Sequence, residues 1–120
     1  MTQPYTGPPF RISLHVTFHI DPSKISAFFT ALKPAYDAVT AEPECVFFEV
    51  YQSPDTPGKI KFVENWNASV EWLMNVQIPK EYYKEYQETT KPMWVKPIEW
   101  EIFERMPGNE WVAVKDAMLK

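Results

Sequence analysis

The sequence has few of the residues that usually build cofactor or metal sites. It contains a single cysteine, Cys45, so no disulfide can form within the chain and no cysteine pair has metal-site spacing. Only 3 of the 120 residues are glycine, and none belongs to a glycine-rich phosphate loop. The sequence also has no nucleophile elbow and no cluster of metal-ligating residues. We therefore expect neither a nucleotide cofactor nor a bound metal.

Basic residues and long apolar runs are scarce as well. The 12 Lys and Arg residues are outnumbered by 16 Asp and Glu, and no basic cluster alternates with aromatic residues. A nucleic-acid partner is therefore not expected. No apolar run approaches the roughly 20 residues that span a bilayer. Residues 1–10 lack the basic and apolar regions of a secretory signal. We expect a cytoplasmic protein that does not bind membranes.

Aromatic residues, in contrast, are abundant. They make up 16% of the chain, and hydrophobic residues make up 45%, which suffices for one domain with its own core. A domain of this size leaves much surface exposed, so pairing two copies would complete the core. The rings could fill the core, form a dimer face or line a cavity, and composition alone does not decide between these roles.

A strand and a helix are predicted first along the chain. Residues 10–20 alternate strictly between apolar and polar side chains, which is typical of a strand with one apolar face. His15 and His19 fall on the polar face of this strand. Asp21 and Pro22 then predict a helix start, and apolar spacings of three and four continue the helix to about residue 41.

Three more strands and a second helical region complete the predicted order. Turn residues 53–58 join strands 46–52 and 59–66 as a hairpin. One face of the later strand carries Ile60, Phe62, Glu64 and Trp66. Asn67 or Ser69 is expected to cap the second helix, and Pro79 to interrupt it. The last strand is expected within 93–106, where Pro97 indicates an edge, a bulge or a later start.

This order of elements predicts an α+β domain of the ferredoxin-like βαββαβ kind. Its four-stranded antiparallel sheet would carry the helices on one face, and the other face would need cover. A second subunit is the expected cover, which would give a homodimer with a dimeric α/β barrel. Residues 1–9 are expected to be a flexible segment, 10–106 the domain, and 107–120 a tail that packs on the domain or on the partner subunit.

Three motifs in this order resemble the antibiotic biosynthesis monooxygenase family. They are the helix-ending turn Glu42-Pro43-Glu44-Cys45, the strand end Val63-Glu64-Asn65-Trp66 followed by Glu71-Trp72-Leu73, and the polar turn Asp21-Pro22-Ser23-Lys24. The resemblance spans about residues 10–106. It implies a dimeric α/β barrel that often acts as an oxygenase without a cofactor. In such enzymes a deprotonated, electron-rich substrate gives an electron directly to O₂ in a dry aromatic pocket.

The resemblance also suggests site residues. Trp66 matches the tryptophan at the strand end, which can form a rigid wall for a substrate or simply pack in the core. Trp72 matches a pocket-facing helix position of haem-degrading relatives. Many members carry a histidine where this chain has Val76 or Gln77. Gln77 can orient a substrate oxygen but cannot act as a general base at neutral pH, so a histidine-based mechanism is not carried over.

Tyr82 and Tyr83 stand close to the position where haem-degrading members carry their iron-binding histidine. Tyrosine ligation of haem is uncommon, so the substitution argues against haem degradation. Tyr83 or Tyr86 could instead donate a hydrogen bond to a phenolate or carboxylate. Alternatively, the tyrosines could pack on the sheet with their hydroxyls in water. Haem binding therefore stays an alternative, with Tyr83 as its ligand.

His15 is the general-base candidate, because histidine titrates near neutral pH and this strand face would point into the dimeric barrel. Both histidines could also be structural. We predict His15, Trp66 and Tyr83 as catalytic residues. The expected substrate-binding residues are His19, Phe28, Phe62, Trp72, Gln77 and Tyr86.

The sequence thus predicts a cofactor-independent monooxygenase that oxidises a small hydrophobic, phenolic, polyketide-like or oxylipin-like metabolite with O₂. A dimeric barrel that only binds a hydrophobic ligand is the first alternative. An isomerase or cyclase on the same scaffold is another. The pattern does not decide whether the pocket lies under the helices or inside the barrel.

Overall fold

The computed structural model describes residues 5–115, and its order of elements confirms the ferredoxin-like βαββαβ prediction. The strands are β1 (Ile12–His19), β2 (Cys45–Gln52), β3 (Lys59–Trp66) and β4 (Glu99–Glu104). The helices are α1 (Ile25–Thr40), α2 (Val70–Trp72) and α3 (Glu81–Thr90). Three short helical turns complete the order: η1 (Pro22–Lys24), the π-helical η2 (Leu73–Gln77) and η3 (Lys91–Met93).

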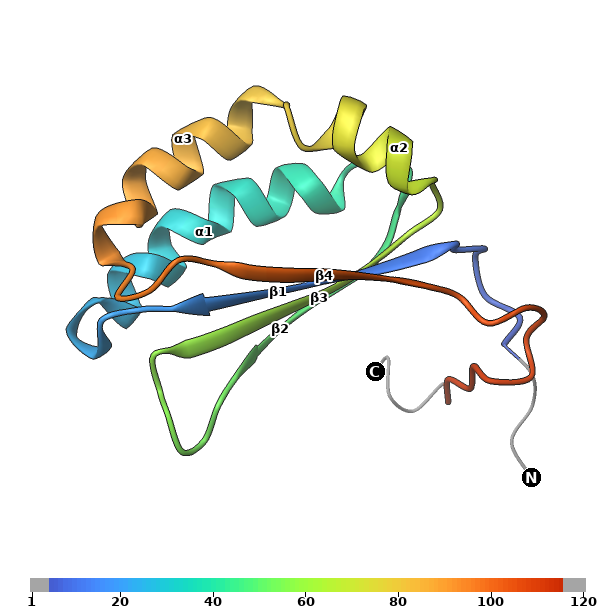
Figure 1. Cartoon of the computed structure of the whole chain (residues 1–120), viewed down its shortest axis with the longest axis horizontal. Coiled ribbons are helices and arrows are strands. Elements are labelled where there is room, and N and C mark those ends of the chain that lie inside the picture. The colour runs from blue at the N-terminus through green and yellow to red at the C-terminus, as the bar shows by residue number, and fades with distance from the viewer. Residues whose placement is uncertain (1–4, 116–120) are drawn as a thin grey trace.

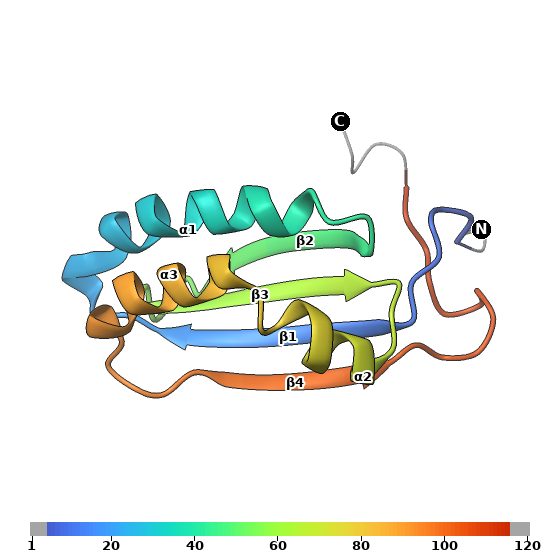
Figure 2. The ribbon, with the colours of Figure 1, turned by 90° about the horizontal axis from the view of Figure 1, so that it is seen from above.

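The strands form one antiparallel sheet in the order β2-β3-β1-β4. All helices lie on one face of this sheet (Figure 1). Seen from above, α1 runs beside β2 and α3 runs over the middle of the sheet, while β4 lies outside both long helices (Figure 2). Residues 1–4 and 116–120 lie outside the described residues, so the roles expected of the two terminal segments stay predictions.

The core lies between the sheet and the helices. The predicted alternation of β1 is confirmed, since Ile12, Leu14, Val16 and Phe18 are buried and the residues between them are half-buried. On β3 the buried residues are Ile60, Phe62, Glu64 and Trp66, as the sequence pattern indicates. Four residues of α1 complete this layer: Phe28, Leu32, Ala35 and Val39. The helix-facing side of the sheet is therefore apolar except at Glu64.

The turns follow the capping signals in the sequence. The Asp21 carboxylate accepts a hydrogen bond from the backbone N–H of Ser23 at 2.9 Å, which starts η1. Of the two predicted caps for the second helix, Ser69 is the one used, and it accepts from the Trp72 N–H at 3.0 Å. The last strand begins at Glu99, later than residue 93, because Pro97 has no N–H to contribute to a strand ladder.

Two local features mark the two ends of the hairpin between β2 and β3. The pairing shifts between Cys45 and Phe47, so Cys45 and Phe48 both turn toward the helices. Gly58, at the other end of the hairpin, accepts a hydrogen bond from the Ile20 N–H at 2.7 Å. A Cβ atom at residue 58 would overlap the carbonyl oxygen of Ile20, so this close approach requires glycine. Within residues 5–115, no helix is long and apolar enough to cross a membrane.

Candidate functional site

A partly enclosed cavity of about 220 Å³ lies between the helices and the sheet. Its inner wall is apolar and largely aromatic, with Phe18, Phe48 and Phe62 on the strands and Tyr36 on α1. An engineered apolar cavity of about 150 Å³ accommodates benzene, so this space suits a ligand larger than a single ring. This cavity lies on the helix side of the sheet.

The mouth of the cavity lies between the π-helical segment, α3 and the uncovered strand β4. Met74, Ile78 and Trp100 line the cavity and are also 37%, 38% and 49% exposed. Gln87, an exposed residue of α3, adds a polar group to this rim. A π-helical turn often occurs at a functional site, and here it forms one edge of the opening.

Glu64 is the one carboxyl group that lines the cavity among residues 5–115, and its side chain is only 5% exposed. Burial disfavours the charged carboxylate and raises the pKa of Glu64 from its ordinary 4.5 to about 7. The Trp66 indole N–H donates to Oε1 of Glu64 at 3.1 Å and opposes part of this shift. No Lys, Arg or His of the described chain lines the cavity. Glu64 can therefore hold or release a proton near neutral pH.

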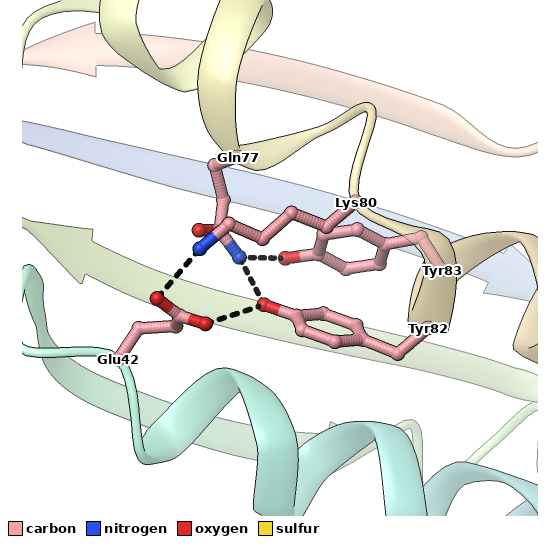
Figure 3. A network of polar contacts seen from close by, with 5 residues as sticks. All are labelled: Glu42, Gln77, Lys80, Tyr82 and Tyr83. Atoms are coloured by element: carbon pink, nitrogen blue, oxygen red, sulfur yellow. Dashed lines mark hydrogen bonds and ion pairs between the residues drawn. The ribbon is translucent and has the colours of Figure 1, made fainter.

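Tyr83 lines the same cavity and is held by a chain of polar contacts that starts at the surface (Figure 3). Lys80 Nζ pairs with Glu42 Oε2 at 2.7 Å, and the Tyr82 hydroxyl donates to Glu42 Oε1 at 3.2 Å. The Gln77 amide then donates to the Tyr82 hydroxyl at 2.6 Å and to the Tyr83 hydroxyl at 3.0 Å. This series of polar contacts links the end of α1 with η2 and α3.

The chemistry of these groups fixes which of them donates in each hydrogen bond. The ionised Glu42 carboxylate can only accept, so the single Tyr82 hydroxyl proton is used on Glu42. Tyr82 must then accept from Gln77, which fixes the Gln77 amide with its NH₂ group toward both tyrosines. Of the Gln77 amide atoms, only Oε1 then lacks a partner in the described chain, whereas the reversed amide would leave its buried N–H donors unpaired.

Tyr83 consequently keeps a hydroxyl proton that has no acceptor among the described residues. Tyr86, one turn further along α3, also lines the cavity, and its buried hydroxyl has no hydrogen-bond partner in the described chain. Burial first, and then the nearby Glu64 charge, raise the pKa of both tyrosines above the usual value. Both hydroxyls therefore stay protonated at neutral pH, and each can donate a hydrogen bond to a ligand.

His15 and His19 lie on the opposite face of the sheet and do not line the cavity. The His15 imidazole contacts Ser13 Oγ at 2.9 Å and packs against the Phe103 ring, with 5.0 Å between ring centres. Desolvation, followed by the nearby Lys61 charge, lowers the pKa of His15. His19 contacts the Glu99 carboxylate at 2.5 Å. The catalytic and binding roles predicted for these histidines stay predictions, which concern the barrel side of the sheet.

The other predicted site residues fall into two groups. Phe62, Tyr83 and Tyr86 line the cavity. Trp66, Phe28, Trp72 and Gln77 surround it without lining it. Trp66 is fully buried, donates a hydrogen bond to Glu64 and packs on Trp72, with 6.2 Å between ring centres. Gln77 is also fully buried and acts on the cavity through Tyr83.

Glu64 was absent from the residues that the sequence predicted for the site. Its signal is visible in hindsight, because it is the one charged residue on the apolar face of β3, between Phe62 and Trp66. The sequence alone does not show that α3 and η2 leave space above this carboxyl group. The rim residues Met74 and Ile78 were missed for the same reason.

The fold is that of a small ferredoxin-like α+β protein with a cavity between its helices and its sheet. The chain belongs to the antibiotic biosynthesis monooxygenase family, whose profile matches residues 11–73. It is 48% identical over 100 residues to a protein of Pestalotiopsis microspora that is named as a candidate monooxygenase, and the match covers 83% of each chain. The family resemblance expected from the sequence is thereby confirmed.

Solved structures share the same fold. A candidate antibiotic biosynthesis monooxygenase from Caulobacter crescentus superimposes with a TM-score of 0.73 at 21% identity, covering 81% of this chain and 91% of that one. A conserved protein from Methanosarcina mazei gives the same TM-score and identity, covering 81% of this chain and 94% of that one.

Proposed function

We propose that the protein is a cofactor-independent monooxygenase that oxidises a small hydrophobic metabolite with O₂ in the cavity under its helices. Family membership and the relative from P. microspora support a monooxygenase-type function. The observation that carries the finer proposal is the cavity itself, an apolar space of about 220 Å³ lined by aromatic rings and a single carboxyl group among the described residues. Such a site favours a substrate with an oxidisable ring and one acidic group.

The reaction needs no external reductant when the substrate supplies all the electrons. A phenol that loses its hydroxyl hydrogen and one ring hydrogen and gains one oxygen atom becomes a quinone. The second oxygen atom leaves with these two hydrogens as water. O₂ is reduced by four electrons, all of which come from the phenol. The protein would contribute proton removal, a fixed orientation and exclusion of water from the bound anion. The apolar lining around Phe18, Phe48 and Phe62 suits the exclusion of water.

Oxygen uptake by protein stripped of metal and flavin tests the proposal. The probe is α-naphthol, a two-ring phenol, and the expected products are one naphthoquinone and one water for each O₂ consumed. Its methyl ether is the matched control, because it has the same rings but no acidic proton. Uptake that appears only with added flavin, or that disappears on chelation, would contradict a cofactor-independent reaction. Binding without any oxygen uptake would favour a ligand-binding barrel.

We further propose that two copies pair through the sheet face opposite the helices. This face carries the half-buried side chains His15, Phe47 and Val63 and the half-exposed Phe103, and no helix of the described chain covers it. Its charged groups are of both signs, including Lys61 and Glu101, so two copies can be complementary. Sedimentation at equilibrium should give twice the mass of the chain, and a monomer at micromolar concentration would refute the pairing. The cytoplasmic location expected from the sequence stays a prediction.

A further inference from the structure

The polar groups of the cavity are few and lie close together, which allows each to be given a role. Among the described lining residues, Glu64 on β3 is the single one that can carry a negative charge at neutral pH. Tyr83 and Tyr86 on α3 line the same cavity, close enough to Glu64 for its charge to act on both hydroxyls. Cys45 on β2 is also close to Glu64, and Tyr36 lines the cavity from α1. Strands β1 and β4 contribute apolar side chains to the lining.

Of Glu64, Cys45, Tyr83 and Tyr86, only Glu64 changes its charge near neutral pH. Burial, with the Glu64 charge as the second cause, raises the pKa of Cys45 to about 12. The pKa values of Tyr83 and Tyr86 are raised as well, first by burial. The carboxyl group can therefore take up a proton in the cavity, while the two hydroxyls remain donors.

We propose that Glu64 is the catalytic residue that removes a proton from the bound substrate, and that the Tyr83 hydroxyl donates a hydrogen bond to the oxygen atom that then carries the negative charge. The inference rests on the proposed function, because it assigns residues to the first step of that reaction. Its geometric basis is the buried carboxyl group in the cavity wall and the unused hydroxyl proton of Tyr83.

The step balances in atoms and charge. The substrate O–H bond breaks, its electron pair stays on the substrate oxygen, and the proton moves to the Glu64 carboxylate. The negative charge moves from the carboxylate to the substrate and no new charge is created in the apolar cavity. This exchange avoids the cost of desolvating an additional ion. The substrate class that fits is a phenol, or an enolisable ketone. In the ketone the C–H bond beside the carbonyl breaks, its proton moves to Glu64, and its electron pair moves onto the oxygen that Tyr83 contacts, which gives an enolate.

Gln77 is a positioning residue in this scheme. Its amide donates to the Tyr83 oxygen, so the hydroxyl proton of Tyr83 must point to a different acceptor. The contacts from Gln77 through Tyr82 to Glu42 and Lys80 hold this arrangement from outside the cavity. A substrate oxygen would then complete the hydrogen bonding of Tyr83.

The pH dependence of probe binding tests the proposal without requiring turnover. Phenols titrate near pH 10, so α-naphthol stays un-ionised between pH 6 and 8. The Glu64 carboxylate is a stronger acceptor than the protonated acid. The Kd of wild-type protein for α-naphthol, measured anaerobically by fluorescence, should therefore fall about fivefold to tenfold as the pH rises over this range. The methyl ether has no hydroxyl proton to donate, so it should bind no more tightly at pH 8 than at pH 6.

Matched variants separate the role of Glu64 from the role of Tyr83. Glu64→Gln should remove the pH dependence for α-naphthol, whereas Glu104→Gln, at an exposed position near the end of β4, should keep it. Tyr83→Phe should weaken α-naphthol binding at both pH values, and Tyr51→Phe, which removes an exposed hydroxyl on β2 outside the cavity lining, should leave it unchanged. Wild-type binding that is independent of pH, or the same pH dependence in Glu64→Gln, would overturn the proposal.

Measurement of oxygen uptake distinguishes a wrong assignment of Glu64 from a wrong proposal for the function. If the pH dependence requires Glu64 but no O₂ is consumed, the proton acceptor is identified and the oxygenase reaction is refuted. If O₂ is consumed equally by wild type and Glu64→Gln, the reaction stands and Glu64 is not its base.

Discussion

The buried carboxyl group of Glu64 predicts a stability profile that a single substitution should change. In the folded protein the pKa of Glu64 is raised from 4.5 to about 7, so the folded state holds this proton more tightly than the unfolded state does. The favourable contribution of the protonated group is complete below pH 4.5 and is lost as the pH rises toward 7. Above that range the wild-type protein carries a desolvated carboxylate that Glu64→Gln does not have.

The expected magnitude follows from the size of the shift. A rise from 4.5 to about 7 corresponds to about 3 kcal/mol of unfolding free energy, at about 1.4 kcal/mol for each pH unit. The Glu64 side chain is only 5% exposed, so solvent screening reduces this little. A glutamine can also keep the acceptor oxygen for the Trp66 indole N–H. We therefore expect Glu64→Gln to be more stable than wild type at pH 8 and nearly equal to it at pH 4.5.

Urea unfolding followed by tryptophan fluorescence measures this difference. Wild type, Glu64→Gln and the exposed control Glu104→Gln are compared at equal protein concentration at pH 4.5 and pH 8, because pairing of two copies would make stability depend on concentration. The advantage of Glu64→Gln should grow by about 2–3 kcal/mol between the two pH values, and the control should show no such growth. If the advantage of Glu64→Gln does not change with pH, or if the variant is less stable than wild type at pH 8, the assignment of a buried carboxyl group without a cationic partner is refuted.

Three further substitutions test other parts of the structure. Gly58→Ala should lower the unfolding free energy by about 1–3 kcal/mol in urea unfolding, because its Cβ overlaps the Ile20 carbonyl oxygen; an unchanged midpoint would contradict this contact. Gln77→Leu should cost about 1–3 kcal/mol, because two tyrosine hydroxyls lose their donor in a buried position, and a neutral effect in the same assay would argue against the network. Trp66→Phe should move the Glu64 titration to higher pH, because the indole N–H that stabilises the carboxylate is removed; NMR titration of the Glu64 side chain would show an unchanged midpoint if that hydrogen bond were unimportant.

Much of the fold could be predicted because periodicity and turn residues act locally. The strict alternation in β1 fixes which face is buried, and Asp21 marks the start of the helical region with a side-chain cap. Ser69 acts in the same way before α2. Pro97 indicated a late start for the last strand, although its first residue, Glu99, follows from pairing with β1 that the sequence does not show.

The candidate site was harder to predict because a cavity is a property of packing between distant segments. The alternation in β3 places Glu64 on the buried face, but its raised pKa depends on how α3 and η2 cover it. Tyr83 could be proposed as a donor from its residue type, whereas the direction of its proton depends on Gln77 and on the contact between Tyr82 and Glu42. His15 looked suitable because histidine titrates near neutral pH, yet it lies on the far side of the sheet from this cavity.

The location of a bound ligand tests the central claim most directly. A crystal structure with α-naphthol, grown without oxygen, should place its rings between the helices and the sheet beside Phe62. The naphthol oxygen should lie within hydrogen-bond distance of both Glu64 and Tyr83. A naphthol molecule on the opposite face of the sheet, with its oxygen beside His15 and the cavity empty, would contradict the account and return the catalytic role to the histidine.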